Sequence, residues 1–454
     1  MRPVVTPEEM KAIDRASPEP VAVLVERAGA AVARAALQLL GGGYGRRAVV
    51  IAGKGNNGAD GRAAAVRLAR RGVRIEVIEA ADRPPRLAPV DLVIDAAYGT
   101  GFYGEYDAPD PAGSPVLAVD IPSGVNGLTG ETGGQPARAA RTVTFAAYKP
   151  GLVFQPGADL AGEVTVADIG LDTSGATAWV VEEEDVQAWL PSPGAESHKW
   201  KAGLWVLAGS GGMTGAANLC ARAALRSGGS TVRLGIPGVP PAPDSLEVVG
   251  RTVPATGWDA TVLEELDRMK ALVVGPGLAR GKGTGEAVRR LVAEAPVPTL
   301  VDADGLFALG SVDDARAVLS GRDKGTVLTP HDGEFSRMVG SKPGPDRLEA
   351  TRDLARRTGA TVLLKGSTTI VAEPGGRALI STAGDARLAT AGTGDVLSGV
   401  IGAFLAQGLE PLEAAGAAAY VHGMAARLGW RRGLVAGDLL DLLPAVLNRL
   451  PGEE

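Results

Sequence analysis

The sequence predicts two α/β domains in tandem, each built on a mainly parallel sheet. Three observations indicate this class. Short, nearly all-apolar runs alternate with amphipathic stretches, many of the apolar runs end in Gly or Asp, and a stretch of small and acidic residues after position 172 separates two such series. Strands that are apolar on both sides are typical of parallel sheets with helices on both faces. The expected domains are residues 1–174 and 175–454.

The expected elements follow in order along the chain. Residues 6–40 are expected to be helical, with Thr6 as N-cap, Pro7 in the first turn and a stop at the glycines from Gly41. In the first domain we then expect a helix at 58–72 and strands at 48–53, 73–80, 91–99, 115–124 and 142–151. In the second domain we expect helices at 217–228, 395–409 and 412–428, and strands at 203–210, 231–237, 271–277, 299–305, 326–334, 360–366 and 368–374.

Composition excludes several classes of protein. Hydrophobic residues make up 45% and charged residues 22%, which is typical of a globular chain and not of a disordered one. The net charge of −6 provides no basic field for nucleic acid. No apolar run approaches the roughly 18 residues of a membrane helix, and no signal peptide is evident. Cys220 as the sole cysteine fits a reducing compartment. We therefore expect a cytoplasmic protein with neither nucleic acid nor membrane as partner.

The segment GKGNNGADG, residues 53–61, follows an expected strand and opens an expected helix. Gly53, Gly55 and Gly58 match G-x-G-x-x-G, a pattern typical of dinucleotide sites, although a tight strand-to-helix turn uses the same glycines. The loop also carries oxygen-bearing side chains that a simple phosphate turn does not need: Asn56, Asn57 and Asp60.

Two further strand ends carry the same chemistry. Asp95 is followed by the flexible loop 99–101, and the next strand ends in Asp120 and Ser123. Each Asp alone is more simply a loop cap. However, the carboxyl ends of parallel strands share one edge of the sheet, where ligands bind. Three oxygen-rich loops at that edge suit a hard cation together with a phosphate-bearing ligand.

Residues 6–172 resemble the NAD(P)HX epimerase family through NNGADG, DAAYGTG, VDIPSGVNGLTGE and TFAAYKPGLVFQPG. The resemblance implies a Rossmann-like three-layer α/β fold and a potassium ion held by Asn57, Asp95 and Ser123. Asp120 would be the catalytic residue, acting as a proton shuttle and stabilising the cation that forms in the ring. Lys54 and Ala59 stand where the family commonly has Pro and Gly. The substrate, hydrated NADH or NADPH (NADHX or NADPHX), would be lined by Asn56, Asn57, Gly58, Ala59, Asp60, Gly99, Thr100, Gly101, Phe102, Tyr103, Gly104, Glu105 and Asp120.

Glycines also precede a helix in LATAGTGDVLSG, residues 388–399. Gly392 and Gly394 would let backbone N–H groups surround an anion. Asp395 lies in the first turn of that helix, where it either meets a substrate hydroxyl or simply caps the helix. Three upstream strand ends carry polar groups: VDADGL at 301–306, TPHDGEF with His331, and LLKGSTTIV with Lys365. A lone histidine is more often structural, and a polar hairpin turn would account for the last segment in isolation.

These motifs, with SHKW, GSGGMTGAA and VGPGL, resemble the ADP- or ATP-dependent NAD(P)HX dehydratase family over about residues 190–452. The resemblance implies a ribokinase-like fold, with Asp395 as the catalytic base beside the transferring phosphoryl group. Asp332 stands where the family usually has Pro, and residues 388–392 differ from a segment often rich in Lys and Gly. The hydrate would contact Ala216, Gly277, His331 and Asp395. The nucleotide, expected to be ADP ahead of ATP and accompanied by Mg²⁺, would contact Lys365, Gly366, Ser367, Thr368, Thr369, Asp385, Ala386, Arg387, Leu388, Ala389, Thr390, Ala391, Gly392, Thr393 and Gly394.

Together the two halves predict a bifunctional enzyme that epimerises the R and S hydrates and then dehydrates the S hydrate, with small-molecule substrates and a homo-oligomeric state. One alternative is a Rossmann oxidoreductase fused to a sugar or vitamin kinase. Glu79 disfavours it, because this acidic residue lies 26 residues after Gly53 and the fingerprint places it about 20 residues on. A second alternative is a first domain that only binds its ligand.

Overall fold

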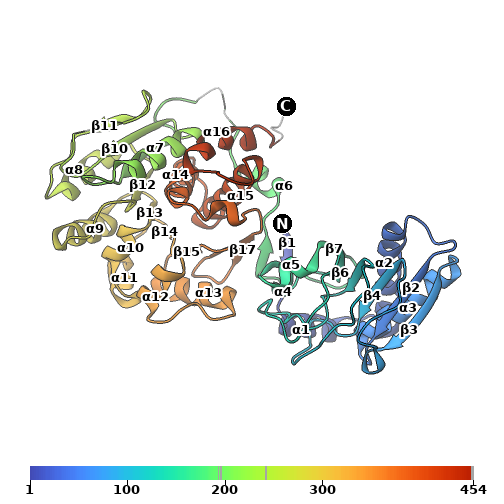
Figure 1. Ribbon diagram of the computed structural model, residues 1–454. Helices are drawn as coiled ribbons and strands as arrows, with labels where there is room; N and C mark the ends of the chain where they lie inside the picture. Colours follow the sequence, from blue (N-terminus) through green and yellow to red (C-terminus); the bar gives the residue numbers. More distant parts are fainter. Residues whose placement is uncertain (193, 195–196, 241–242, 451–454) are drawn as a thin grey trace. The chain divides into compact units, whose positions relative to one another are not determined.

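The computed structural model describes residues 1–192, 194, 197–240 and 243–450, in two compact units (Figure 1). The first unit comprises Arg2–Ala178, and the second comprises Trp179–Glu454 with Met1. The expected division between residues 174 and 175 lies just before the observed one. The expected end of the second domain, residue 454, lies outside the described residues. No helix in the described part of the chain has the length and apolar character needed to cross a membrane.

The first unit contains a six-stranded sheet in the order β3-β2-β4-β5-β6-β7, and every pair is parallel. The chain passes from β2 outward to β3 and then returns to β4 on the other side of β2. The carboxyl ends of β2 and β4 therefore form a topological switch point, where α/β folds bind ligands. The strands are β2 (Arg47–Ala52), β3 (Arg74–Glu79), β4 (Leu92–Ala96), β5 (Val116–Val119), β6 (Arg141–Phe145) and β7 (Glu163–Ala167).

Helices α2 (Val21–Leu40) and α3 (Asn56–Arg70) pack together and cover one face of this sheet, with Val32 and Leu68 fully buried between them and the strands. The other face is covered by η1 (Ala80–Asp82) and by loop residues such as Leu87 and Tyr106. Short strand β1 (Arg2–Val4) and helices α1 (Pro7–Ala16), α4 (Pro150–Val153) and α5 (Gly157–Ala161) complete the unit.

The predicted start of α1 and end of α2 are confirmed, whereas other predicted boundaries of this unit shift, such as the end of β5 at Val119 in place of residue 124. Thr6 caps α1 in a capping box with Glu9, and Gly41, at φ 66°, ends α2. Helix α3 begins at Asn56 and not at residue 58, so Asn57 lies in its first turn. The strand expected at 142–151 was too long, because β6 ends at Phe145 and α4 follows from Pro150, a residue that favours a helix start.

The sheet of the second unit runs β17-β16-β15-β14-β13-β12-β9-β10-β11. The seven strands from β15 to β11 are parallel, whereas β16 and β17 are added antiparallel. The chain goes from β9 to β10 and β11 and then returns to β12, so a second switch point lies between β9 and β12. The strands are β9 (Gly203–Leu207), β10 (Thr231–Gly235), β11 (Val249–Arg251), β12 (Ala271–Val274), β13 (Thr299–Val301), β14 (Thr326–Leu328), β15 (Thr361–Leu364), β16 (Thr369–Ala372) and β17 (Ala378–Ser381). β8 (Ala178–Val180) lies at the division between the units.

The largest core of this unit surrounds α14 (Thr393–Ala406), which is buried along almost its whole length among α7 (Thr214–Arg226), α15 (Pro411–Leu428), α16 (Ala436–Leu447) and the sheet. Gly399 makes this packing possible, because a methyl group there would lie 2.2 Å from the carbonyl oxygen of Cys220. The other helices are α6 (Glu183–Trp189), α8 (Trp258–Glu265), α9 (Lys282–Glu294), α10 (Asp304–Leu309), α11 (Val312–Leu319), α12 (Asp332–Val339) and α13 (Arg347–Thr358), with 3₁₀ turns η2 (Leu266–Arg268) and η3 (Ala386–Leu388).

Candidate active sites

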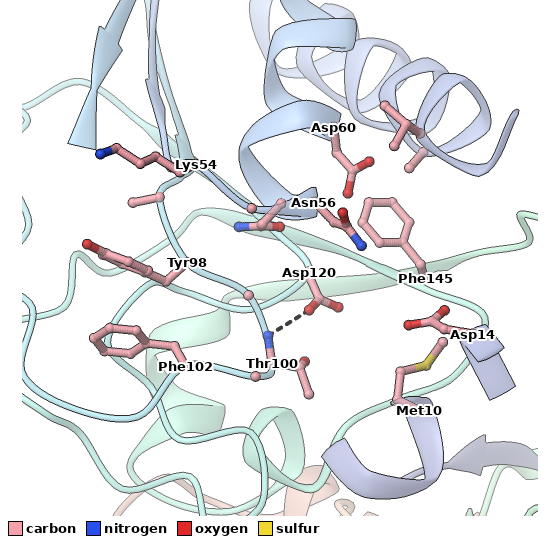
Figure 2. A pocket seen from close by; sticks show the side chains of 18 of the residues that line it. Met10, Asp14, Lys54, Asn56, Asp60, Tyr98, Thr100, Phe102, Asp120 and Phe145 are labelled. Carbon is pink, nitrogen blue, oxygen red and sulfur yellow. Dashed lines mark hydrogen bonds between the residues drawn. The ribbon is translucent and has the colours of Figure 1, made fainter. Parts of the chain in front are cut away.

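A cavity of about 720 Å³ opens at the switch point of the first unit (Figure 2). The loops after β2, β4 and β5 supply most of its polar wall, and α1 and α2 close another side with Met10, Lys11, Asp14 and apolar residues. A pocket of this size and position is a usual place for a small-molecule site. The following predicted residues line it: Asn56, Asn57, Asp60, Gly99, Thr100, Gly101, Phe102 and Asp120.

The glycine fingerprint shapes one wall. A methyl group at Gly58 would lie 1.8 Å from the carbonyl oxygen of Gly53, and one at Gly53 would lie 1.9 Å from that of Ala97, so neither position accepts a side chain. At Gly55, the N-cap residue of α3, an added methyl group would meet nothing within 4 Å. The N-terminus of α3 is therefore open to an anionic group of a ligand.

Asp120 is held on three sides. Its Oδ2 accepts a hydrogen bond of 2.9 Å from the Thr100 backbone N–H, drawn in Figure 2. Its Oδ1 accepts from the Thr144 hydroxyl at 3.2 Å and lies 2.9 Å from Lys149 Nζ. The backbone of Asp120 is in the left-handed region, at φ 66°. Such strained residues concentrate at functional sites.

Lys149 sets the charge of this carboxyl group. Its side chain is only 1% exposed, and its ammonium group also donates to Thr144 Oγ1 and to the Phe145 carbonyl oxygen. Burial acts to raise the pKa of Asp120, but Lys149 and the Thr100 hydrogen bond outweigh it, so the pKa lies below its ordinary value. Asp120 is therefore an ionised, fixed carboxylate at neutral pH. No role for Lys149 was predicted, although a lysine between Tyr148 and Pro150 in an apolar segment is a usable signal.

Two further carboxyl groups face the same cavity. Asp60 is buried, at 8% exposure, and Asp14 of α1 is exposed at the cavity wall. Burial, with repulsion from Asp120 and Asp14, raises the pKa of Asp60 to about 8. Asp14 was also missed, because the expected helix at 6–40 gave no indication of which face meets the sheet edge.

The three expected potassium ligands lie around one loop. Ser123 donates from its hydroxyl to Asp95 Oδ1 at 2.6 Å and from its backbone N–H to Oδ2 at 2.9 Å. The same hydroxyl accepts a hydrogen bond of 2.9 Å from the backbone N–H of Tyr98. The next residue, Gly99, is close to Asn57, because a methyl group added at Gly99 would lie 3.4 Å from Asn57 Cβ. Both amide atoms of Asn57 are buried without a hydrogen-bond partner among the described residues. The unpaired buried amide oxygen of Asn57, the Asp95 carboxylate and the Ser123 hydroxyl are the kinds of oxygen ligand that a hard cation takes.

The other expected lining residues of this unit are placed differently. Gly58 packs on Gly53 inside the turn, and Ala59 is the next residue of α3. Tyr103 is 65% exposed, and Gly104 and Glu105 are also exposed. None of these five is among the residues that line the cavity within the described structure.

In the second unit, polar groups meet at the carboxyl ends of β13, β14 and β15. Asp302 after β13 is 2% exposed, and its Oδ1 lies 2.8 Å from Lys365 Nζ after β15. Ser398 of α14 donates to Asp302 Oδ2 at 2.7 Å, and Glu334 of α12 lies 3.9 Å from the lysine. Burial opposes the charge on both partners, but their attraction lowers the pKa of Asp302 and raises that of Lys365. Asp302 was visible as a polar residue at a strand end, but its pairing with Lys365 was not predicted.

Asp395 occupies the first turn of α14, as predicted. Gly392, the N-cap residue, is left-handed at φ 89°, and a Cβ atom at Gly394 would lie 3.8 Å from Lys365 Nζ. The start of α14 thus meets the half-buried ammonium group of Lys365. Burial and the charge of Asp302 raise the pKa of Asp395 to about 6, although Lys365 acts to lower it. A carboxyl group poised near neutral pH suits a general base.

His331 has a structural role that the sequence also allowed. It is the N-cap residue of α12, and its Nδ1 accepts from the backbone N–H of Gly333 at 2.9 Å and of Glu334 at 3.3 Å. A nitrogen that accepts carries no proton, so the ring proton is on Nε2, which lies 3.5 Å from Glu334 Oε2. Asp332 forms a two-pronged ion pair with Arg347, at 2.8 and 3.1 Å, so its added charge is neutralised there.

The two segments expected to bind the nucleotide form a hairpin turn and the loop before α14. Residues 365–369 make the turn of the β15–β16 hairpin, with Ser367 exposed and Thr369 opening β16. In the second segment, Asp385 pairs with Arg387, and the Thr393 hydroxyl lies 2.8 Å and 2.9 Å from the carbonyl oxygens of Leu388 and Thr390, which closes the loop before α14.

The expected hydrate contacts Ala216 and Gly277 lie together. A methyl group at Gly277, which is left-handed at φ 64°, would lie 3.1 Å from Ala216 Cβ. They meet at the switch point of β9 and β12.

Comparison with known proteins identifies the family. The profile of a family described as NAD(P)H-hydrate dehydratase matches residues 204–447, and that of the YjeF-related protein N-terminus matches 21–88 and 78–151. A protein of Moorella thermoacetica named bifunctional NAD(P)H-hydrate repair enzyme Nnr is 38% identical, over 99% of this chain and 97% of its own length. The chain belongs to the bifunctional NAD(P)H-hydrate repair enzymes. A relative of the same name from Escherichia coli is 33% identical over 89% of this chain and 85% of its own.

Solved structures agree with this membership for the second half of the repair enzyme. The ADP/ATP-dependent NAD(P)H-hydrate dehydratase from Bacillus subtilis, co-crystallised with ATP and Mg²⁺, has a TM-score of 0.51 and is 32% identical. It covers 60% of this chain and 98% of its own. A ribokinase-like superfamily protein from Enterococcus faecalis, 19% identical with a TM-score of 0.51 over 60% of this chain and 96% of its own, shows the same fold. The predicted α/β fold and family are confirmed, and the oxidoreductase–kinase alternative is excluded.

Proposed function

We propose that this chain restores hydrated NADH and NADPH in two reactions, one in each unit. The first unit interconverts the R and S hydrates, and the second removes water from the S hydrate with ADP or ATP. The observation that carries the proposal is the pair of contrasting carboxyl groups. Asp120 is held ionised by Lys149 in the first cavity, and Asp395 is poised near neutral pH beside Lys365 in the second unit.

In the first reaction the ring nitrogen expels the neighbouring hydroxyl group, and the resulting cation takes up water on either face. A fixed carboxylate beside that cation lowers the barrier, because it needs no reorganisation as charge develops. Asp120 supplies this carboxylate. Asn57, Asp95 and Ser123 would hold a potassium ion, which would add positive charge near the phosphates of the substrate. The open N-terminus of α3 would bind one of those phosphates.

In the second reaction Asp395 takes the proton of the ring hydroxyl, and that oxygen attacks the terminal phosphoryl group. The bond between this phosphoryl group and the rest of the nucleotide breaks. The ring carbon–oxygen bond then breaks with release of inorganic phosphate, and loss of a ring proton restores NADH or NADPH. Lys365 and the N-terminus of α14 balance the negative charge of the phosphoryl group. Phosphate leaves readily, whereas hydroxide does not.

Recovery of nicotinamide absorbance from a mixture of both hydrates tests the proposal. The full chain with Mg²⁺ and nucleotide should convert the whole mixture, faster than the hydrates interconvert spontaneously. Conversion of the S hydrate alone would contradict the first activity, and no nucleotide-dependent recovery would contradict the second.

The proposal also covers the preferred nucleotide, the cellular compartment and the oligomeric state. We expect ADP to be preferred to ATP, which kcat/KM with each donor would decide. We place the protein in the cytoplasm, since its free Cys220 is buried and needs no oxidising compartment. We expect a homo-oligomer, which sedimentation analysis would test.

A further inference from the structure

Asp60 is a buried carboxyl group that the mechanism above leaves without a task. It lies in the second turn of α3, and Figure 2 shows it across the cavity from Asp120 and Asp14. The three groups come from three separate elements, α3, the end of β5 and α1. Asp60 is 8% exposed and lines the cavity, so its exposed atoms face the space that a ligand would fill.

The cations of the cavity do not neutralise Asp60. Lys149 is committed to Asp120, at 2.9 Å. Lys11 and Lys54 also line the cavity, and the remaining acid of its wall, Glu79, pairs with Arg62. Within the described structure Asp60 forms no ion pair with any of them. A buried carboxylate that has no cation and faces two other acids is strongly disfavoured, so Asp60 keeps its proton at neutral pH. Its pKa of about 8 agrees with this assignment.

The first reaction needs such a proton. Hydroxide is a poor leaving group from the ring carbon, and protonation of the hydroxyl oxygen turns it into water. Asp120 cannot supply that proton while Lys149 holds it ionised. Enzymes place one protonated and one ionised carboxyl group in the same pocket so that the first acts as an acid and the second stabilises positive charge.

We propose that Asp60 is the proton donor and acceptor of the epimerisation, with Asp120 acting as the carboxylate that stabilises the cation. Asp60 gives its proton to the ring hydroxyl as the carbon–oxygen bond breaks, and the bonding electrons leave with the water molecule. When water adds to the opposite face of the cation, it returns a proton to Asp60. No other reactant is needed. This assignment divides between two residues the role expected of Asp120 alone, and it rests on the proposed epimerase activity of the first unit.

The test compares full-length variants on a purified single hydrate without nucleotide, so that dehydration does not occur. Asp60→Asn keeps the size of the side chain and removes the donor. Epimerisation above the spontaneous rate should fall by about a hundredfold or more, the usual contribution of general acid–base catalysis. Nucleotide-dependent dehydration of the S hydrate should be unchanged, because it takes place in the second unit. Asp82→Asn, an exposed change in η1, is the matched control and should retain both activities.

The pH profile of the parent protein supplies a second test that does not depend on the folding of Asp60→Asn. Epimerisation should fall as pH rises through about 8, because the donor then loses its proton. Asp14→Asn removes one of the two negative charges that repel Asp60, so this fall should move to lower pH. The assignment would be overturned if Asp60→Asn epimerised the hydrate at a rate within about threefold of the parent. It would also be overturned if the parent rate stayed constant from pH 7 to 9. A parent with no epimerisation at any pH would instead overturn the proposed function itself.

Discussion

Lys149 Nζ and Asp120 Oδ1 form a buried ion pair 2.9 Å apart at the carboxyl edge of the first sheet. Lys149 also donates at 2.8 Å to both Thr144 Oγ1 and the Phe145 carbonyl oxygen, so its three N–H bonds are all used. An ammonium group held in this way acts as a fixed counter-charge and not as a proton carrier. Its effect on the reaction therefore passes through the position and ionisation of Asp120.

Replacement of that lysine should change the pH dependence of epimerisation. Lys149→Met keeps most of the buried stem and removes the charge, so the pKa of Asp120 rises. Asp120 works in its ionised form, and the acidic limb of the epimerisation profile should therefore move to higher pH. Removing one partner of a buried pair also costs roughly 3–5 kcal/mol of stability. The double variant Lys149→Met/Asp120→Asn should recover part of that stability without activity. An unshifted acidic limb in the single variant would contradict the role given to Lys149.

Asp120→Asn should abolish enzymatic epimerisation and keep the backbone fold, although the loss of the counter-charge of Lys149 lowers the stability of the unit. The native residue has φ 66°, and asparagine is among the few residues that adopt this region readily. The amide oxygen can still accept from the Thr100 N–H, but it carries no charge to stabilise the ring cation. Epimer interconversion followed by chromatography should drop to the spontaneous rate, with dehydration of the S hydrate as internal control. Interconversion at the parent rate would rule out Asp120.

Asp60 should make the first unit less stable as pH rises. Its pKa is about 8 in the folded protein and near 3.8 when exposed, so between these values only the unfolded chain releases the proton. The free energy of unfolding should therefore fall by up to roughly 1.4 kcal/mol per pH unit in this window. Asp60→Asn should remove that dependence and stabilise the unit near pH 7.

Hydrogen exchange of peptides from residues 2–178 measures this effect locally. All six tryptophans lie at or after Trp179, so tryptophan fluorescence follows unfolding of the second unit alone and serves as the control. Equal pH dependence in the parent and in Asp60→Asn would show that the carboxyl group is ionised in the folded state.

The sequence predicted the central strands and the loops after them because their signals are local, whereas β7, β11 and β17 were missed. Apolar runs that end in Gly or Asp mark the strands, and the residues that cannot accept a side chain, Gly53 and Gly58, are visible as a motif. Lys149 and Asp14 could not be placed in the same way. Their roles depend on contacts between elements distant in sequence, β5 with the segment before α4, and α1 with the sheet edge.

The second site shows the same limit. Asp302, Lys365 and Ser398 meet only because three consecutive parallel strands and α14 converge, and 96 residues separate the first from the last. The neutralisation of Asp332 could not be predicted either, because its partner Arg347 is on the next helix, 15 residues later in the sequence.

Lys365→Ala should weaken nucleotide binding and also destabilise the second unit. The lysine is the cationic partner of Asp302, which is 2% exposed, so the change leaves a buried carboxylate without its counter-charge. The double variant Lys365→Ala/Asp302→Ala should regain stability but not affinity, which separates the two effects. Calorimetric titration with ADP and ATP measures the affinity, and epimerisation should be spared. Parent-like affinity in a folded variant would remove Lys365 from the nucleotide site.

Asp395→Asn distinguishes a base from a helix cap. As a general base Asp395 should contribute about 10²–10⁴-fold to the rate, whereas a cap contributes about 1 kcal/mol of stability. The structure favours the base, since α14 has no side-chain cap bond and Gly392 occupies the N-cap position. The variant should bind nucleotide, unfold at a temperature within a few degrees of the parent and lose dehydration activity by about a hundredfold or more.

In the parent, dehydration should fall as pH drops below about 6, because protonated Asp395 cannot accept the hydroxyl proton. Substantial dehydration by Asp395→Asn with that acidic limb intact would require another residue as the base.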